Sequence, residues 1–342
     1  MELRFGFVGF GNVARAFARM LQSNGLRLAG KSGLRWRTTA IATANHGCVL
    51  SDSCIDLNDA ADLCENGGSL LELPATIDCG DAESLIDRCE ADVIFETTPL
   101  NPQEGEPATS YIRSALDRGI NVVTANKGPL AFAYRELREL AELRGVSFRF
   151  EGAVMDGAPV FNMVESCLPA VEILGFEGVL NSTTNHILTE METGRSFDES
   201  LVDAQRLGIA EANADYDIDG WDAAVKAVAL ANVLMRADKR PAQVDRQGIR
   251  GIAHSQLKAA ADEDCAIRLV ARASASAAGL TLSVAPETVP LSSPLGAAKG
   301  RTNVLVLRTD LMGQLAMFEI DPGIEQTAYA LLSDLLKIHE AI

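Results

Sequence analysis

The first 150 residues alternate short apolar runs with segments of helical periodicity. Apolar, β-like runs occur at 3–8, 38–43, 91–97, 120–125 and 146–151. Helical spacing occurs at 12–22, 108–118 and 130–144, and a polar stretch with a further helical segment lies between the second and third runs. Strands that alternate with helices in this way predict a parallel sheet with crossover helices.

The pattern changes after residue 152. Residues 176–190 pass from a β-like run into a helical one, and helices are expected at 197–207, 221–236 and 254–262. Further β-like runs follow at 265–272, 280–285, 303–309 and 314–319. This order predicts a second domain of the α+β type. The last helix, about 324–338, is amphipathic, and its spacing alone fits either domain.

Composition and charge narrow the class of protein. The 342 residues are 47% apolar and 23% charged, as in a soluble globular protein of two domains. The formal net charge of −17 comes without a basic stripe, which argues against nucleic acids or membrane surfaces as partners. No apolar run is long enough for a membrane span, and the start lacks a signal-peptide pattern. The seven cysteines are odd in number and scattered, which argues against a disulfide framework and against a zinc site. We therefore expect a reducing, cytoplasmic location.

A glycine-rich turn lies between the first strand and the first helix. Gly9, Gly11 and Ala14 form a G-x-G-x-x-A pattern. Gly9 allows the tight turn, Gly11 allows backbone to approach a pyrophosphate, and Ala14 lets the helix pack on the sheet. Phosphates would then lie on N–H groups at the helix N-terminus. We therefore predict a dinucleotide-binding domain of the Rossmann type.

The end of the second strand bears on the choice of coenzyme. An acidic residue there would bind the ribose hydroxyl of NAD. The segment from Ile41 to Gly47, IATANHG, contains no acid, and Asn45 and His46 could accommodate a 2′-phosphate. This slightly favours NADP, although the two residues could also serve only as a turn.

Two further stretches carry candidate chemistry. In TANKGPLA, Lys127 directly follows a strand, where α/β folds place residues that contact ligands. A solvated loop lysine is the alternative. In LNSTTNHILTEM, five consecutive polar residues precede an apolar helix, and helix capping explains one or two of them. The rest indicate a polar ligand site. Those five residues are Asn181, Ser182, Thr183, Thr184 and Asn185.

One lysine stands alone in the apolar helix predicted over 221–236. Helical spacing would put Asp219, Asp222 and Lys226 on one face, with Ala, Val and Leu around the lysine. An exposed Asp222–Lys226 pair is the alternative, although an exposed helix should show a broader polar face. A buried ammonium needs partners, and burial shifts lysine pKa values toward those useful in proton transfer. The upstream carboxylates Glu211 and Asp217 could keep Lys226 charged or bind a substrate ammonium.

These elements together make the chain resemble the homoserine dehydrogenases, which reduce L-aspartate 4-semialdehyde to L-homoserine with NAD(P)H in threonine, methionine and isoleucine biosynthesis. The similarity lies in GFVGFGNVARAF, TANKGPLA, EGAVMDGAPV, GVLNSTTNHILTEM and AQRLGIAEANADYDIDGWDAAVKAVALA. It runs from the N-terminus to about residue 235 and continues more weakly through PLSSPLGAAKGRTNVLVL to the last helix. The resemblance is to the short form, without a kinase or regulatory tail.

The resemblance implies roles for individual residues. Lys226 would be the general acid that protonates the aldehyde oxygen, and the base in reverse, while Lys127 would assist where substrate and nicotinamide meet. The implied substrate-binding residues are Glu211, Asp217, Asp222, Asn181 and Thr183, with Asp217 also organising Lys226. The coenzyme contacts expected from the glycine turn, the second strand and the resemblance are Gly9, Phe10, Gly11, Asn12, Val13, Asn45, Thr97, Thr98, Lys127, Gly208 and Gly323.

The resemblance also implies a structural monovalent cation, often sodium, held largely by backbone carbonyls. The matching positions are Glu151, Val154, Asp156 and Ala158. A plain turn between domains is the alternative for this segment. The chain departs from the family pattern at Asp156, where a small residue is common, and in IDPGIEQTA at 320–328. Asp156 could add a carboxylate to the cation site or point into the substrate pocket.

The resulting prediction is an α/β enzyme of two domains. Residues 1–150, completed by a C-terminal helix within 321–342, would form the Rossmann-type dinucleotide-binding domain, and 151–320 the α+β catalytic and dimerisation domain. The expected activity is a homoserine dehydrogenase acting on a small-molecule substrate as a homodimer. The alternatives are a related oxidoreductase for another small amino or hydroxy acid, suggested by the two departures, and a non-catalytic dinucleotide sensor.

Overall fold

The chain folds into two compact units in a computed structural model that describes residues 2–277 and 279–342. The first unit runs through Pro159 and resumes with Gly323–Ile342, and the second is Val160–Pro322. The strands of the first unit are β1 (Glu2–Val8), β2 (Arg35–Ala42), β3 (Cys48–Leu50), β4 (Ile77–Asp78), β5 (Val93–Glu96), β6 (Asn121–Thr124) and β7 (Phe148–Arg149). Its helices are α1 (Asn12–Ser32), α2 (Leu57–Glu65), α3 (Ala82–Arg88), α4 (Ala108–Asp117), α5 (Lys127–Phe132), α6 (Tyr134–Arg144) and α14 (Ile324–Ala341).

The sheet of the first unit has the strand order β4-β3-β2-β1-β5-β6-β7. Strands β2, β1, β5, β6 and β7 pair in parallel, as expected. The expectation of a wholly parallel sheet is wrong at one edge, where β3 and β4 are antiparallel. Both are too short for a periodic pattern, and β3 returns beside β2 through a turn at Gly47, whose φ is +93°. The two neighbours of β1 in the sheet are β2 on one side and β5 on the other, so the order of strands reverses at β1. Ligands of open α/β sheets bind at such a switch point.

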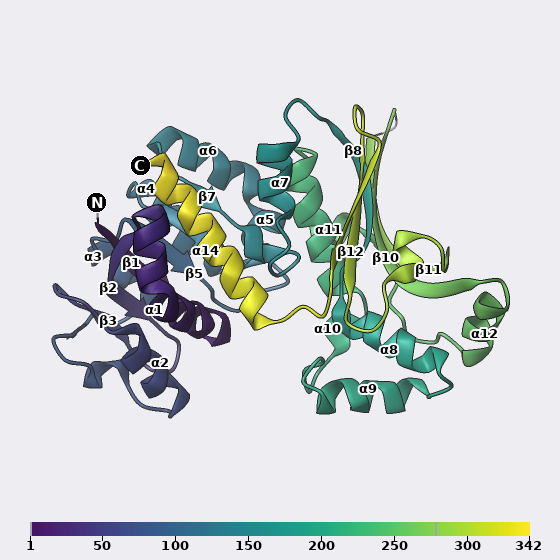
Figure 1. Cartoon of the computed structure of the whole chain (residues 1–342), viewed down its shortest axis with the longest axis horizontal. Helices are drawn as coiled ribbons and strands as arrows, with labels where there is room; N and C mark the ends of the chain where they lie inside the picture. The colour runs from purple at the N-terminus through teal and green to yellow at the C-terminus, as the bar shows by residue number, and fades with distance from the viewer. Residues whose placement is uncertain (1, 278) are drawn as a thin grey trace. The chain divides into compact units, whose positions relative to one another are not determined.

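A phenylalanine-rich core fills the first unit. The rings of Phe5 and Phe7 in β1 pack on Phe95 in β5, and Phe17 of α1 covers them. Helix α14 lies alongside α1, as the yellow and purple helices of Figure 1 show. The apolar face recognised in the last helix is buried in the same core. The core residues on this face of α14 are Leu331, Leu332, Leu335 and Ile338.

Two helices of the first unit differ in extent from their sequence-based predictions. Helix α1 continues ten residues past the predicted end at 22, because Leu28 buries a further turn, and it stops at Gly33 with φ +71°. The single helix expected over 130–144 is instead α5 followed by α6, because the backbone of Ala133 leaves the helical region at φ −146°. The break separates the segment that begins with Lys127 from the charged outer helix α6.

The second unit contains a mixed sheet, of which Figure 1 labels β8, β10, β11 and β12. Its strand order is β13-β12-β8-β10-β11-β9. Its strands are β8 (Ile173–Val179), β9 (Asp245–Arg246), β10 (Cys265–Ser276), β11 (Gly279–Pro290), β12 (Asn303–Thr309) and β13 (Gln314–Glu319). Its helices are α7 (Val160–Cys167), α8 (Ser182–Glu192), α9 (Phe197–Arg206), α10 (Asp215–Ile218), α11 (Trp221–Leu234), α12 (His254–Asp262) and α13 (Pro294–Ala297). Pairing is antiparallel except between β9 and β11.

The strands predicted after residue 264 are all present, while α7 and the two-residue β9 were not predicted. Helix α11 is buried almost all round, as its composition indicated, and it contacts β10 and β11. The α/β fold class with two sheets is confirmed. In the part of the chain that the structure describes, every helix is too short or too polar to traverse a lipid bilayer.

Candidate active site

The turn after β1 lies directly against the turn after β5. The φ of Gly9 is +85°, and a Cβ built there would stand 2.8 Å from the carbonyl carbon of Thr97 and from the nitrogen of Thr98. The Thr97 hydroxyl donates to the Gly9 carbonyl oxygen at 2.9 Å. Glycine is therefore required at position 9 both by the left-handed backbone and by close approach. Of the predicted coenzyme residues, Gly9, Thr97 and Thr98 are brought together.

The N-terminus of α1 fits a dinucleotide pyrophosphate. Helix α1 begins at Asn12 after Gly11, and its first turn contains no acidic residue. A Cβ at Gly11 would meet no atom within 4 Å, so the space in front of these N–H groups is open. Arg15 adds a positive charge nearby, since its guanidinium donates to the Phe10 carbonyl at 3.0 Å and to the Asn12 side chain at 2.7 Å. Open N–H groups at a positive helix end favour an anion.

The predicted coenzyme-selecting segment forms the turn between β2 and β3. Asn45 is exposed on this turn, and the His46 ring bonds the Gly68 carbonyl through Nδ1 at 2.8 Å. The Thr43 hydroxyl accepts from the His46 backbone N–H at 2.7 Å. His46 therefore has a structural role in the turn, whereas Asn45 remains available to a ligand.

Lys127 is the first residue of α5, directly after β6. Asn126 caps this helix, because its side-chain oxygen accepts from the Gly128 N–H at 2.9 Å. A Cβ at Gly128 would lie 3.1 Å from the Gly105 Cα, so the segment packs closely against the preceding loop. Lys127 is half-buried. Its backbone is thus fixed by a cap on one side and by packing on the other.

The predicted cation segment is an irregular stretch tied to α14. Glu151–Ala153 form a short 3-10 helix, and the Glu151 N–H donates to the buried Asp334 of α14 at 2.7 Å. Asp156 has a positive φ of +37°, and its carboxylate accepts from the Thr327 hydroxyl at 2.9 Å. Within residues 2–277 and 279–342, no three His, Cys, Asp or Glu side chains are grouped as a metal site. A cation on this segment would need backbone carbonyls.

Gly323 stands immediately before α14 as its N-cap. Its φ of −166° is extended backbone that any residue adopts. A Cβ there would lie 3.4 Å from the Gln326 side-chain oxygen. Backbone conformation alone therefore does not explain a glycine at this position.

In the second unit, Lys226 lies within a cluster of polar groups. Its ammonium donates to the Leu180 carbonyl at 2.7 Å and lies 3.3 Å from an Asp222 carboxylate oxygen. Only 15% of the Lys226 side chain and 10% of the Asp222 side chain are exposed. The predicted pair therefore exists, and the exposed alternative is wrong because the surrounding Ala and Val side chains leave it little access to water.

Asn181 links this pair to Asp217. Its amide nitrogen donates to Asp217 at 2.8 Å and to Asp222 at 2.9 Å, while its oxygen accepts from the Thr184 N–H at 2.8 Å and so caps α8. Burial and the neighbouring Asp222 charge raise the pKa of Asp217. Two carboxylates thus share one amide beside one ammonium, which is an arrangement poised for proton exchange.

The polar residues in the first turn of α8 make different contacts. The Thr183 hydroxyl donates to the Ile209 carbonyl at 3.1 Å. A hydrogen bond from Thr183 to Asp217 opposes the rise in the pKa of that carboxylate. Ser182 donates to the Arg301 carbonyl at 2.9 Å, and Asn185 donates to the Thr302 carbonyl at 3.0 Å. Ser182 and Asn185 therefore attach α8 to the segment before β12.

The loop from α9 to α10 carries two predicted residues on the surface. Gly208 has a φ of +69° at the end of α9, where a left-handed residue is favoured, and Glu211 is exposed. The expectation that Asp219 shares a helical face with Lys226 is wrong. Gly220 is left-handed and separates α10 from α11, and the Asp219 carboxylate instead bonds the Arg250 guanidinium at 2.6 Å.

Two polar groups near these sites were missed from the sequence. Glu96, the last residue of β5, is fully buried under the turns of the coenzyme unit. Among the residues that the structure describes, the buried Tyr216 hydroxyl has no hydrogen-bond partner, and burial and the Asp222 and Asp217 charges raise the pKa of this phenol. Glu96 and Thr124 are each the last residue but one of the strands predicted over 91–97 and 120–125, and the pairing of those two strands was the available signal.

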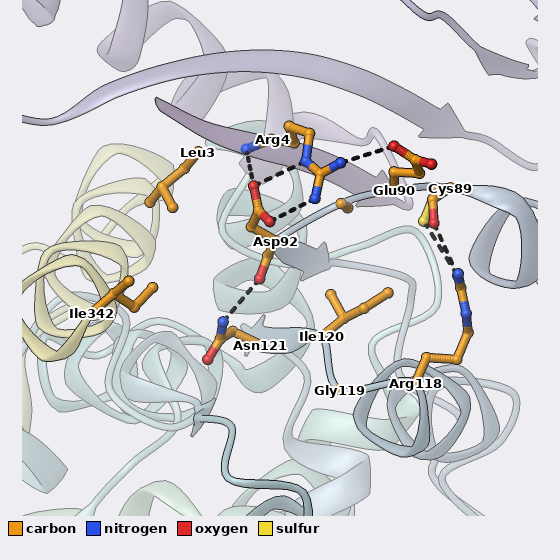
Figure 2. A pocket seen from close by; sticks show the side chains of 11 residues that line it. Leu3, Arg4, Cys89, Glu90, Asp92, Arg118, Gly119, Ile120, Asn121 and Ile342 are labelled. Carbon is orange, nitrogen blue, oxygen red and sulfur yellow. Dashed lines mark hydrogen bonds and ion pairs between the residues drawn. The ribbon is translucent and has the colours of Figure 1, made fainter. Parts of the chain in front are cut away.

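The amino ends of the same strands enclose a separate cavity of about 500 Å³. Arg4 pairs there with Asp92 at 2.9 Å and with Glu90 at 2.9 Å, and Arg118 donates to the Cys89 carbonyl at 3.0 Å (Figure 2). Arg4, Asp92 and Glu90 are therefore engaged with one another, and Arg118 is engaged with backbone carbonyls. This cavity lies at the sheet edge opposite the turns described above, because those follow the carboxyl ends of β1, β5 and β6.

Family models match nearly the whole chain. Residues 9–151 match the model described as the NAD-binding domain of homoserine dehydrogenase, and residues 159–336 match the model described as homoserine dehydrogenase. A protein of Pseudomonas canavaninivorans named NAD(+)-dependent homoserine dehydrogenase is 36% identical over 99% of this chain and 97% of its own length. A homoserine dehydrogenase of Methanocaldococcus jannaschii is 36% identical over 98% of both chains.

A solved structure has the same fold. The structure of a hyperthermophilic archaeal homoserine dehydrogenase in complex with NADPH matches with a TM-score of 0.83 and 28% identity, over 100% of this chain and 99% of that one. The fold, the glycine turn and the family models agree on an NAD(P)-binding first unit. The chain belongs to the homoserine dehydrogenase family of NAD(P)-dependent oxidoreductases.

Proposed function

We propose that the chain interconverts L-homoserine and L-aspartate 4-semialdehyde with NAD(P) as the hydride carrier. The observation that carries this proposal is the buried cluster of Lys226, Asp222, Asn181 and Asp217. In this cluster one ammonium group lies beside two carboxylates that can accept protons. Residues 1–150 with a helix from 321–342 would form the coenzyme domain, and 151–320 the catalytic and dimerisation domain. Membership of the family supports the assignment.

The coenzyme is assigned to the first unit. Bound NAD(P) supplies or accepts the hydride. The glycine turn holds the pyrophosphate through backbone N–H groups, and Thr97 and Thr98 line the adjoining turn. The remaining proposed contacts are Phe10, Gly11, Asn12, Val13, Asn45, Lys127, Gly208 and Gly323.

Lys226 is assigned the proton transfer. In the direction of reduction, the Lys226 ammonium gives its proton to the aldehyde oxygen as the hydride reaches the carbonyl carbon, so that no free alkoxide is formed. In the direction of oxidation, the neutral amine takes the proton of the homoserine hydroxyl. The Leu180 carbonyl and Asp222 orient the ammonium for this exchange. Lys127 assists the same transfer.

The carboxylates are assigned to the polar ends of the substrate. Glu211 and Asp222 bind the amino-acid end together with Asn181 and Thr183, while Asp217 binds substrate and keeps Lys226 in place. A substrate ammonium near Asp217 would relieve the repulsion between two buried carboxylates that raises its pKa. This relief would favour an amino acid over a plain hydroxy acid as substrate.

We propose that NADP is the preferred coenzyme. The support is the turn after β2, which has no acid to bind the 2′-hydroxyl of NAD and exposes Asn45. One relative is named as NAD(+)-dependent and one solved relative contains NADPH, so both choices occur among similar proteins. The ratio of kcat/KM for NADP+ and NAD+ measures the preference, and a higher value for NAD+ would contradict it.

A structural monovalent cation is proposed on the segment from Glu151 to Ala158. The proposed ligands are backbone carbonyls of Glu151, Val154, Asp156 and Ala158, and oxygen donors suit a hard cation such as sodium. The left-handed backbone of Asp156 supports this by turning the chain sharply within the segment. The Tm in sodium chloride should exceed that in an equal concentration of choline chloride.

A cytoplasmic homodimer is the proposed state of the protein. All seven cysteines are free thiols, as expected in a reducing compartment. Apolar side chains exposed at and beside the hairpin of β12 and β13 support association through the second unit, with exposed fractions of 71% for Leu311, 43% for Met312 and 42% for Phe318. Light scattering on the purified protein would give the mass of the assembly.

The proposed reaction is tested by incubating the protein with L-homoserine and either NAD+ or NADP+. Formation of NADH or NADPH at 340 nm, dependent on homoserine, is the expected result. A parallel assay with the corresponding deaminated hydroxy acid tests the requirement for the ammonium group. Absence of turnover of homoserine with both coenzymes would refute the proposal.

A further inference from the structure

Glu96 is a fully buried carboxyl group in the coenzyme unit to which no role has yet been given. It is the last residue of β5 and has no exposed surface. Burial raises the pKa of this carboxyl. A carboxyl group in such a place is costly unless its oxygens are hydrogen-bonded. Its partners therefore indicate why a carboxyl group is there.

One side of Glu96 holds the turn after β5. The backbone N–H of Thr98 donates to Glu96 Oε1 at 2.8 Å, and the Thr98 hydroxyl donates to the same oxygen. The neighbouring Thr97 bonds Gly9 in the glycine turn. Glu96 thus fixes the turn that closes against the proposed pyrophosphate site.

The other side of Glu96 holds the turn after β6. Glu96 and Thr124 are register partners at the ends of two parallel strands, and the Thr124 hydroxyl donates to Glu96 Oε2 at 2.7 Å. That hydroxyl accepts from the Asn126 N–H at 2.9 Å. Lys127 follows immediately, in the segment capped by Asn126. The Lys127 segment is therefore attached to the same carboxyl group.

A further bond closes the network. The Asn126 amide nitrogen donates to the Thr98 carbonyl at 3.1 Å, so the two turns are also joined directly. The donors that face Glu96 are the Thr98 backbone N–H, which can only donate, the Thr98 hydroxyl, and the Thr124 hydroxyl, which already accepts from the Asn126 N–H. The directions of the bonds are consequently fixed, and they require an acceptor at both oxygens of residue 96.

We infer that Glu96 is a positioning residue that joins the coenzyme-binding turn at Thr97 and Thr98 to the Lys127 segment, so that coenzyme affinity and turnover depend on it together. This inference rests on the proposed roles of those residues. It goes beyond them because Glu96 itself would touch neither coenzyme nor substrate. Its effect would be transmitted through Thr98 on one side and through Thr124 and Asn126 on the other.

The substitution Glu96→Gln separates this role from simple filling of space. Glutamine has nearly the same volume, but one of its two oxygens becomes an NH2 group. Facing Thr98, that group would meet a backbone N–H, which is another donor; facing Thr124, it would leave the Thr124 hydroxyl hydrogen without its acceptor. Because the two turns are also joined by the bond from Asn126 to the Thr98 carbonyl, the loss of one support at residue 96 should disturb both turns. We expect the coenzyme Kd to rise about 10-fold and kcat to fall about 10- to 100-fold, as small misplacements of catalytic groups produce.

Asp92→Asn is the matched control at the other end of the same strand. Asp92 precedes β5, accepts three bonds from Arg4 and lines the cavity of Figure 2. Its substitution should lower Tm and leave both the coenzyme Kd and kcat unchanged. If Glu96 only stabilised the fold, Glu96→Gln would likewise lower Tm and leave the coenzyme Kd and kcat unchanged. A positioning role instead requires that the coenzyme Kd and kcat change in Glu96→Gln and not in Asp92→Asn.

The experiment measures coenzyme Kd by fluorescence of bound NADPH, and kcat and the KM for homoserine at saturating coenzyme, all well below each Tm. Thr124→Val serves as a second variant. It should lower kcat with little change in coenzyme Kd, because the Thr98 side of Glu96 remains intact. The KM for homoserine should change less than twofold in both variants, since the proposed substrate residues lie in the second unit.

Wild-type Kd and kcat in Glu96→Gln would overturn the inference. The same holds if Asp92→Asn reduces coenzyme affinity and turnover as much as Glu96→Gln does. Failure of the proposed function would look different, because the wild-type chain would then not oxidise homoserine at all. The coenzyme Kd of the variants would still decide the role of Glu96.

Discussion

Replacing Lys226 by methionine tests both the proposed chemistry and the energetics of the buried cluster. Methionine is unbranched and fills similar space, so the substitution mainly removes the ammonium. The Leu180 carbonyl loses its 2.7 Å donor, and Asp222 loses the positive charge at 3.3 Å. Asp222 and Asp217 are then two carboxylates bridged by a single Asn181 amide.

The magnitude follows from that geometry. Removing one partner of a buried ion pair costs about 3–5 kcal/mol. The Lys226 and Asp222 side chains are 15% and 10% exposed, which puts the cost near the lower limit, about 3 kcal/mol. For a unit of this size, each kcal/mol lowers Tm by about 2–4 °C, so we expect a fall of about 6–12 °C. Loss of a general acid should lower kcat by about 10²- to 10⁴-fold.

The assay compares kcat, coenzyme Kd and Tm for the wild type, Lys226→Met and Lys258→Met. Lys258 is exposed on α12 and serves as the control for losing a lysine. The coenzyme Kd should be unchanged in both variants. A kcat of Lys226→Met within threefold of the wild type would refute the assigned proton transfer. A Tm equal to that of the wild type would refute the inference that a buried charge is left without its partner.

Three further predictions concern individual side chains. Gly9→Ala should raise the coenzyme Kd at least 10-fold in a fluorescence titration, because its Cβ would lie 2.8 Å from Thr97 at a φ of +85°; an unchanged Kd would contradict this. Tyr216→Phe should stabilise the protein by about 1 kcal/mol in urea unfolding, since the buried hydroxyl has no hydrogen-bond partner within residues 2–277 and 279–342, and a lower stability would show that it is bonded. Asp217→Asn should raise stability at pH 7 more than at pH 4. Because the pKa of Asp217 is raised in the folded protein, its contribution to folding stability is fully present below the unfolded-state pKa, which is near 4. That contribution is lost as the pH rises through the folded-state pKa. An equal effect at both pH values would contradict that sign.

The fold was predictable wherever one element was long enough to show its own period. Strand β1, which ends just before Gly9, and helix α11, which contains Lys226, are such elements. Strands β3 and β4 have three and two residues, so their place in the sheet depends on partners distant in sequence. The break at Ala133 had no local signal either, because alanine favours a helix and the break follows from packing around α5.

The candidate site was predictable as a set of residue types and not as a set of contacts. The isolation of Lys226 among Ala and Val indicated burial, and Asp222 at four residues' distance was its natural partner. Asp219 was misassigned because Gly220 ends the helical path between them. Glu96 was passed over because its partner Thr124 lies 28 residues away, and only the pairing of β5 with β6 brings their side chains together.

The return of α14 to the first unit has a consequence for the order of folding during synthesis. Ribosomes release a chain from its N-terminus, and domains that are continuous in sequence fold as they emerge. The first unit lacks Leu331, Leu335 and Ile338 against α1 until residues beyond Gly323 have been made. The second unit, Val160–Pro322, has by then been synthesised in full. The unit synthesised first is therefore the one completed last, and its apolar α1 surface is what chaperones would meet on the nascent chain.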